Sequence, residues 1–484
     1  MRIARSVAVL LALAAVASGC TSGHHGGPAP APPAGIGGRT VPGGGPTLGA
    51  KWDWSRAERF TPYLGRLPAG ATFSELVWCD VEPERGRVDW STPDRVVRSA
   101  RRLGYAVFLK LRVGSCWATP DPHPDQRRGA KGKTASAMPA DLEAYRAWVD
   151  TAVRRYAPLG VHEYAIENEV NAANFWADSP AAYERLAAVA AAAVRAADPR
   201  ALVVDCGISS TAYGVAIADD LLRRGRAAEA VAAYQRYYSR RFQRRGRDFP
   251  EVADGAGLRA ALARPEARRS LAFLEVANRL ARQRVVDVRQ LHFYESWDNL
   301  PALLGYVRAA VPPGFPLQAW EVGMFWPGGN GDATARAGEL VKTVSLLLAA
   351  GVRPLIWLPL AFDPGGRHAG EPRYGLLEPD GRPRPAAAAF QRLAAAATGA
   401  TSWEGVTGRD LAGVVFGRGG SSALVVWSER GAALHLKSQP GGRAEQVTGG
   451  QVPWGREGLQ VGAQPLLITL RSGADGAALL ERAR

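Results

Sequence analysis

The chain has 484 residues, of which 47% are hydrophobic and 22% are charged, and its formal net charge is +15. These fractions are typical of a globular protein and exclude a disordered chain or a membrane protein with several spans. Most of the basic residues are arginines scattered along a chain rich in alanine, glycine and proline, which indicates a GC-rich genome, and no nucleic-acid partner is expected.

Residues 1–20, MRIARSVAVLLALAAVASGC, predict an export signal. Two arginines flank the start of an apolar run that is too short to span a bilayer, and small residues follow up to Cys20. The ending ASGC resembles a bacterial lipobox, which implies lipidation of Cys20 and anchoring to the membrane of the cell envelope. Simple secretion is the alternative. Residues 21–46 contain no core-forming pattern and predict a flexible tether.

Cysteine usage fits an exported protein. After Cys20, only Cys79, Cys116 and Cys206 remain, too few and too widely spaced for a zinc site or a disulfide scaffold. One disulfide can form in an oxidising compartment, and Cys79 with Cys116 is the favoured pair because these residues end neighbouring predicted strands. Cys206 is then expected to be buried and reduced.

Between residues 47 and 398, eight short apolar runs alternate with segments of helical character. The runs begin at residues 47, 71, 105, 161, 201, 285, 316 and 353. Eight such alternations, with strands that are apolar almost throughout, predict an α/β fold of the (β/α)₈ TIM barrel type. An open doubly wound sheet is the rival fold, but no glycine-rich dinucleotide or phosphate-binding fingerprint follows any run.

One connection, residues 209–284, is too long for a single helix, so it is expected to contain an insertion with helices of its own. Arginines concentrate at residues 234–247 within it. This stretch can contact an acidic polymer or anionic lipid, although a solvated helix face is the simpler interpretation.

From residue 402 to residue 484 the pattern changes to short β-prone runs separated by glycine-rich turns. This pattern predicts a small antiparallel β-domain that packs against the barrel. Carbohydrate binding is the alternative role, with Trp403, Trp427 and Trp454 as the stacking residues.

The active site of a barrel lies at the carboxyl ends of its strands, where this sequence gathers polar and aromatic residues. The fourth run ends in Glu167, Asn168 and Glu169, the sixth in His292 and Tyr294, and the seventh in Glu321. Glu169 and Glu321 can therefore face one pocket. Glycoside hydrolysis needs such a pair, because one carboxylic acid protonates the leaving oxygen while the other carboxylate attacks the anomeric carbon or activates water.

The segment YAIENEVNAANFW, residues 164–176, resembles the strand-four motif of clan A glycoside hydrolases, and WCDVEPERGRVDW, residues 78–90, resembles the segment after their second strand. The pattern is nearest to the family of β-xylosidases and α-L-iduronidases. The resemblance implies a retaining mechanism in which Glu169 is the acid/base, Asn168 binds the sugar 2-hydroxyl and Glu321 is the nucleophile.

The motif departs from the family on both sides of the Asn-Glu pair. Glu167 and Val170 stand where the family commonly has tryptophan and proline. The extra carboxylate of Glu167 is expected either to tune its neighbour Glu169 or to form an ion pair with an arginine.

Other residues at the strand ends are candidates for substrate binding. His292 and Tyr294 alternate on one strand face and are expected to point into the pocket, with a hydrogen-bonded place in the core as the alternative. Four tryptophans can stack on a sugar face or pack in the core: Trp78, Trp117, Trp176 and Trp357. No His-Glu-x-x-His run or Gly-x-Ser-x-Gly elbow is present, so no metal, cofactor or serine nucleophile is expected.

The sequence therefore predicts an exported, retaining glycosidase that acts on an oligosaccharide or glycan at the cell envelope. A catalytically silent, glycan-binding barrel is the alternative, and an adhesive envelope lipoprotein is a third hypothesis. Carboxyl groups of Glu169 and Glu321 about 5 Å apart would support retention, and a gap of about 6.5 Å or more would suggest inversion. Either carboxylate buried in an ion pair outside the cleft would favour the silent barrel.

Overall fold

The structure is a computed structural model, and it describes residues 39–40, 48–52, 57–68, 70–120, 135–242, 249–325, 332–361, 375–407, 411–428, 434–436, 441–455 and 458–471. The predicted export signal and the lipidation candidate Cys20 lie outside the described residues. In the described part of the chain, no helix is both long enough and apolar enough to cross a membrane.

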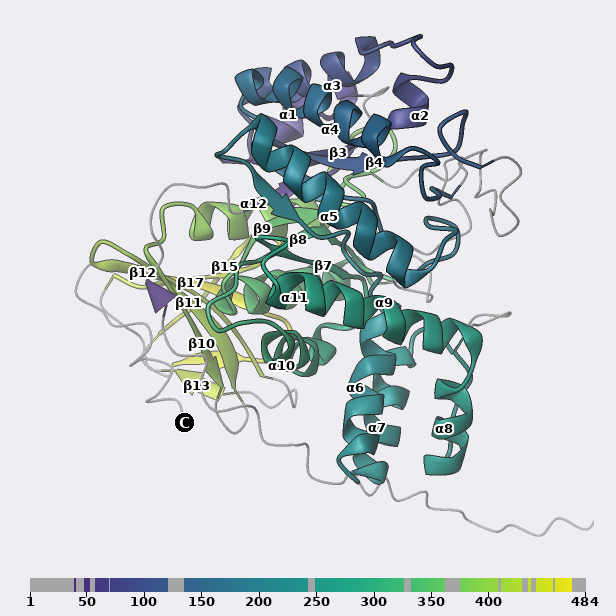
Figure 1. Cartoon of the computed structure of the whole chain (residues 1–484). Coiled ribbons are helices and arrows are strands. Elements are labelled where there is room, and N and C mark those ends of the chain that lie inside the picture. Colours follow the sequence, from purple (N-terminus) through teal and green to yellow (C-terminus); the bar gives the residue numbers. More distant parts are fainter. Residues whose placement is uncertain are drawn as a thin grey trace, which may run out of the picture. The chain divides into compact units, whose positions relative to one another are not determined.

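Eight parallel strands form a nearly closed barrel in the order β6-β5-β4-β3-β2-β9-β8-β7 (Figure 1). The strands are β2 (Leu48–Ala50), β3 (Ala71–Val77), β4 (Ala106–Arg112), β5 (Glu163–Ile166), β6 (Leu202–Val204), β7 (Arg289–Phe293), β8 (Leu317–Val322) and β9 (Val352–Trp357). Each coincides with one of the eight apolar runs, although β9 begins one residue before its run. Isolated bridges from Val204 to Val288 and from Ile208 to Leu291 connect the β6 and β7 sides. The predicted (β/α)₈ barrel is confirmed.

Helices follow the strands and cover the outside of the barrel (Figure 1). They are α1 (Ala57–Leu64), α2 (Trp78–Val81), α3 (Ser91–Arg102), α4 (Leu142–Tyr156), α5 (Pro180–Ala197), α10 (Leu300–Ala310), α11 (Ala333–Ala349) and α12 (Pro385–Ala397), with short 3-10 turns η3 (Ala157–Leu159) and η4 (Trp297–Asn299). In α5 the Ser179 side chain accepts a hydrogen bond from the Ala182 N–H, and Pro180 occupies the first turn. Such a cap stabilises a helix by about 1 kcal/mol.

Where the structure describes it, the predicted insertion forms the helices α6 (Thr211–Arg223), α7 (Ala227–Tyr238), α8 (Gly255–Leu262) and α9 (Pro265–Arg282). Two arginines of the basic stretch are paired with acidic residues of the barrel: Arg240 contacts Glu339, and Arg241 contacts Glu295. These two side chains are therefore engaged within the protein, which differs from the expectation of a wholly solvated basic face.

Side chains alternate along β4 and so divide between two cores. Val107, Leu109 and Leu111 face the helices and belong to the large core between the strands and the helical layer. Phe108 faces the barrel interior, where its ring stacks on Trp320 with centroids 5.0 Å apart. The same alternation directs Lys110 and Arg112 inward, toward the carboxyl end of the barrel.

The chain closes with antiparallel strands, which confirms the predicted β-domain. The main sheet has the order β1-β10-β11-β12-β17-β14-β15, and β13 pairs with β16. Their bounds are β1 (Arg39–Thr40), β10 (Ser402–Thr407), β11 (Ala412–Arg418), β12 (Ser421–Trp427), β13 (Leu434–Leu436), β14 (Arg443–Gln446), β15 (Gln451–Val452), β16 (Leu459–Val461) and β17 (Leu466–Leu470). Arg39 pairs with Trp403 and Thr40 with Ser402, so the end of the predicted tether adds an edge strand.

Aromatic contacts join this sheet to the barrel helices. Trp427 on β12 meets Trp297 edge to face at a centroid distance of 5.9 Å, and the ammonium of Lys342 lies 4.8 Å from the Trp297 ring centroid. Trp403 is buried beneath the guanidinium of Arg353. Trp403 and Trp427 therefore serve packing, whereas Trp454 is only partly buried.

Candidate active site

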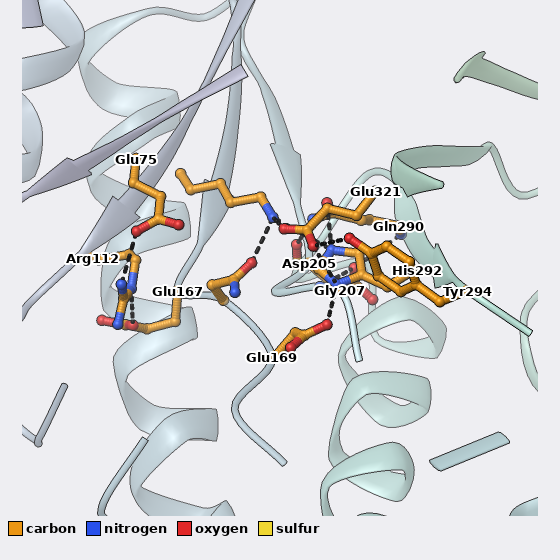
Figure 2. A network of polar contacts seen from close by, with 12 residues as sticks. Glu75, Arg112, Glu167, Glu169, Asp205, Gly207, Gln290, His292, Tyr294 and Glu321 are labelled. Carbon is orange, nitrogen blue, oxygen red and sulfur yellow. Dashed lines mark hydrogen bonds and ion pairs between the residues drawn. The ribbon is translucent and has the colours of Figure 1, made fainter. Parts of the chain in front are cut away.

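Six polar side chains from four barrel strands converge at the carboxyl end of the barrel (Figure 2). They are Lys110 on β4, Asn168 and Glu169 in the turn after β5, His292 on β7, Tyr294 just beyond it, and Glu321 on β8. All are buried except Glu169, whose side chain is 14% exposed. The cluster thus contains every polar residue that the sequence predicted for catalysis or substrate binding.

The turn after β5 has an unusual backbone. Glu167 has a φ of 65° and Glu169 a φ of 41°, in the left-handed region that non-glycine residues seldom adopt. Each such residue costs about 1–3 kcal/mol, so the neighbouring strands must hold it in place. The N–H of Glu169 donates to the carbonyls of Cys206 and Gly207 at 3.1 and 3.0 Å, and the N–H of Glu167 donates to Leu111 at 2.9 Å.

Glu167 points away from the catalytic candidates, toward Arg112 and Glu75 (Figure 2). Its carboxylate accepts the Val113 N–H at 2.6 Å and lies 3.4 Å from Arg112 Nε. Arg112 Nη1 in turn donates to Glu75 at 2.9 Å. Burial raises the pKa of Glu167, and the charge of Arg112 opposes that rise. Of the two interpretations of Glu167, the structure contains the ion pair with an arginine.

Glu169 and Glu321 face each other across His292. One carboxylate oxygen of each and a ring nitrogen of His292 all lie within 4.8 Å of one another. His292 Nδ1 is 2.8 Å from Glu169 Oε1 and 3.7 Å from Glu321 Oε2, and the Tyr294 hydroxyl donates to Glu321 Oε2 at 2.9 Å. An approach of two carboxylate oxygens to within 4.8 Å is compatible with the carboxyl separation of about 5 Å in retaining glycosidases.

Lys110 is the member of the cluster that sequence reasoning missed. Its fully buried ammonium donates to Glu321 Oε1 at 2.7 Å and to Asn168 Oδ1 at 2.5 Å. It also lies 4.4 Å from the ring centroid of Phe73 and 3.4 Å from His292 Nε2. The available signal was a charged residue at an inward position of the otherwise apolar run AVFLKLR.

His292 is held in place by Gln290 on β7 and by residues that follow β6. Gln290 Nε2 donates to the backbone carbonyl of Asp205 at 2.7 Å, which turns Gln290 Oε1 toward His292 Nε2 at 3.2 Å. Gly207 has a φ of 62°, and a Cβ there would lie 2.2 Å from His292 Nε2. Position 207 must therefore be glycine for the imidazole to occupy this place.

Carboxylates and an imidazole at this spacing can bind a metal ion in other proteins. Here the ammonium of Lys110 already lies beside Glu321 and would repel an entering cation. The arrangement is that of a buried ion pair, and we assign no metal ligands or cofactor site to it.

For three of the four candidate tryptophans, the structure favours the alternative of core packing over stacking on a sugar. Trp78, Trp176 and Trp357 are fully buried, so none presents a ring face to a ligand. Trp357 points into the helical layer, where its ring contacts Phe390 on α12, because the preceding residue Ile356 takes the inward position.

The other two buried tryptophans pack within the same core. Trp78 packs against Trp117 and Trp148, and Trp176 packs against Tyr183. Trp117 is partly buried, and the guanidinium of Arg85 lies 5.3 Å from its ring centroid.

Cys79 and Cys116 form a disulfide, with their Cα atoms 5.4 Å apart, as the sequence favoured. It links the segments that follow β3 and β4. Cys206 is a free, buried cysteine, and burial raises the pKa of its thiol to about 12. This matches the expectation of a reduced, structural residue.

No protein-family model matches the chain, and no curated protein matches it. Several solved structures are similar to it. A family 39 glycoside hydrolase from the gut symbiont Bacteroides cellulosilyticus WH2 has a TM-score of 0.60 and 15% identity, covering 88% of this chain and 81% of that one. A GH39 β-xylosidase from Caulobacter crescentus has a TM-score of 0.56 and 15% identity, with 89% and 96% covered. A GH30 endoxylanase from Clostridium papyrosolvens C71 has a TM-score of 0.52 and 13% identity, with 90% and 98% covered.

These structural neighbours are clan A glycoside hydrolases, so the predicted resemblance is confirmed for the fold. At this level of identity the comparison carries the fold alone, and any activity must be argued from the residues of the site.

Proposed function

We propose that this chain, which has the barrel of clan A glycoside hydrolases, is a retaining glycosidase with Glu169 as acid/base and Glu321 as nucleophile. The observation that carries the proposal is the pair of facing glutamates, whose carboxylate oxygens lie within 4.8 Å at the carboxyl end of the barrel. The ion pair of Glu321 with Lys110 lies inside this site and not outside it, which favours an active enzyme over the silent barrel.

The reaction has two displacements. First, Glu321 attacks the anomeric carbon, the bond from that carbon to the leaving oxygen breaks, and Glu169 gives its proton to the leaving oxygen. Second, Glu169 removes a proton from water, the water oxygen attacks the anomeric carbon, and the ester bond to Glu321 breaks. Because each displacement inverts the carbon, the product keeps the configuration of the substrate.

Glu169 lies within hydrogen-bond reach of His292, whose Nδ1 is 2.8 Å from Glu169 Oε1. The other ring nitrogen, Nε2, lies 3.2 Å from Gln290 Oε1 and 3.4 Å from Lys110 Nζ. The first displacement uses the protonated form of Glu169.

The substrate is a glycoside of an oligosaccharide or glycan, and we propose that Asn168 recognises the 2-hydroxyl. Asn168 Oδ1 accepts from Lys110, which leaves Nδ2 to donate toward a sugar oxygen. We further propose that the protein is exported and lipid-anchored through Cys20 to the cell envelope. The signal-like residues 1–20 and the disulfide, which is stable in oxidising compartments, support this location.

The test uses a panel of aryl glycosides with good and poor leaving groups. Glu169→Ala should slow substrates with poor leaving groups most, and azide should restore turnover of activated ones with a product of retained configuration. Glu321→Ala should lose activity whatever the leaving group, because no glycosyl-enzyme can form. The exposed residue Glu143 gives the control, and Glu143→Ala should keep wild-type rates.

Wild-type rates in both site variants on a confirmed substrate would overturn the assignment. Binding of glycan without turnover of any glycoside would instead support the silent barrel.

A further inference from the structure

We propose that Lys110 is a positioning residue that keeps Glu321 ionised as the nucleophile, stabilises it as the departing carboxylate and fixes the amide orientation of Asn168. This inference rests on the proposed function. The resemblance to the glycosidase motif assigns no role to Lys110. Its place in the site follows from the inward alternation of β4.

The burial of Lys110 requires a compensating charge. A fully buried, unpaired ammonium costs several kcal/mol, so such groups are paired or lose their proton. Lys110 Nζ has an anion at 2.7 Å in Glu321 and a neutral acceptor at 2.5 Å in Asn168, and it lies over the face of Phe73. His292 Nε2 lies 3.4 Å from the same ammonium, so a carboxylate, an amide oxygen, an imidazole and an aromatic face surround it.

The two oxygens of Glu321 have different donors. Oε1 accepts from Lys110 and Oε2 from Tyr294, which fixes the plane of the carboxylate. Among the described residues, the titratable and charged groups seen to face Glu321 are Lys110 from β4, Glu169 from the turn after β5, and His292 and Tyr294 from β7 and its end. Lys110 supplies positive charge to this group, while Glu169 and an ionised Tyr294 would oppose it.

The ion pair changes during the reaction. When Glu321 forms the ester, it becomes neutral, and Lys110 loses its counter-charge. When water attacks the anomeric carbon in the second step, the ester bond breaks and Glu321 regains the charge that pairs with Lys110. Lys110 therefore favours the breakdown of the glycosyl-enzyme more than its formation, because a stabilised carboxylate is the better leaving group and the weaker nucleophile.

Lys110→Met tests this role, since it keeps a chain of similar length without the charge. With 2,4-dinitrophenyl glycosides, kcat should fall by about tenfold or more while KM also falls, because the glycosyl-enzyme accumulates. A burst of dinitrophenol should appear in rapid mixing. The acidic limb of kcat/KM should move to higher pH, because Glu321 ionises less readily without the ammonium. A side chain that only filled space would leave the pH profile in place.

Lys342→Met is the matched control, because Lys342 is a largely buried lysine that lies against Trp297 and Trp427. This variant should change the stability of the protein, but it should show no burst of dinitrophenol and no shift of the acidic limb of kcat/KM. The proposal would be overturned if Lys110→Met left unchanged both the pH dependence of kcat/KM and the ratio of the rates at which the glycosyl-enzyme forms and breaks down.

A second measurement does not depend on activity. Urea unfolding midpoints of the full chain are compared for Lys110→Met, Glu321→Gln and the double variant. Each single variant leaves one member of the pair alone, so both midpoints should fall, and the double variant should recover part of the loss. Strictly additive shifts would overturn the ion pair as the basis of the proposal. If the wild type hydrolyses no glycoside, the proposed function fails. The comparison of urea unfolding midpoints then still shows whether Lys110 and Glu321 stabilise each other.

Discussion

Glu167 and Glu169 show how one intervening residue separates two chemical environments. Both have positive φ, yet Glu167 is enclosed by Arg112 and a backbone N–H, whereas Glu169 meets His292 at the more open side of the site. The two nearby carboxylates in IENEVN are therefore separated because their side chains point in different directions. One carboxylate accepts the Val113 N–H and pairs with Arg112, and the other is the proposed acid/base.

The pH dependence of stability should reveal the burial of Glu167. Burial raises its pKa, so the folded chain binds this proton more tightly than the unfolded chain does. The stabilising contribution is complete below the unfolded value of about 4.3 and is lost as pH rises through the folded value. Position 167 does not titrate in Glu167→Gln, so the unfolding free energy of this variant should rise relative to that of the wild type as pH increases above about 4.3, by about 1.4 kcal/mol for each unit of pKa difference.

Urea unfolding at a series of pH values measures this gain. The exposed Glu84 provides the control, and Glu84→Gln should follow the wild type at every pH. A Glu167→Gln curve that loses stability relative to wild type as pH rises would show that Arg112 dominates over burial. Appreciable activity is expected to remain in this variant, because Glu167 does not face Glu169 (Figure 2).

Whether the place of a single residue could be predicted depended on whether the sequence alone indicated its neighbours in the fold. Glu169, Asn168, His292, Tyr294 and Glu321 were found because strand ends in a barrel share one pocket. Lys110 was missed because its partners come from three other strands, which only the folded barrel brings near. The role of the tryptophans stayed open for a related reason, since a strand end alone does not show whether a ring lies inside the barrel or in the helical layer.

At the scale of elements, the disulfide ties together the segments after β3 and β4. Its two cysteines are 37 residues apart in sequence, and a cross-link of that length is expected to contribute about 3–4 kcal/mol through the unfolded state. The double variant Cys79→Ala/Cys116→Ala should therefore unfold at a lower temperature than the oxidised wild type. Calorimetry with and without reductant measures the effect.

The reductant supplies the internal control for that measurement. It should lower the unfolding temperature of the wild type toward that of the double variant and leave the double variant unchanged. Equal temperatures for the oxidised wild type and the double variant would contradict a stabilising role for the bond.

Strands and helices were more predictable than their junctions. The eight barrel strands follow from near-continuous apolar runs, and the long connection 209–284 follows from its length alone. The exact ends differ because hydrogen bonding between strands, which the sequence does not display, decides where each strand stops. Arg39 and Thr40 are an example, as their strand exists only because β10 lies beside them.

At the scale of the molecule, the region before the barrel should contribute little to stability. Residues 21–38 have no core-forming pattern, so a mature chain shortened to begin at Arg39 should unfold at an unchanged temperature. A chain beginning at Thr47 also loses the pairing of β1 with β10, and its unfolding free energy should fall by about 1–2 kcal/mol. Calorimetry of the three chains measures both effects. A large drop for the chain that begins at Arg39 would show that earlier residues pack on the fold.

The circular order of the barrel also constrains the time course of folding. Leu48 on β2 pairs with Leu355 on β9, so the first barrel strand waits for the last one before it has both neighbours. Contacts between positions so far apart in sequence make folding slow, because the chain loses conformational entropy on closing the loop before the contact can stabilise it. A ribosome that releases this chain from its N-terminus therefore delivers β2 with one bare edge, which is covered only when β9 emerges after β8.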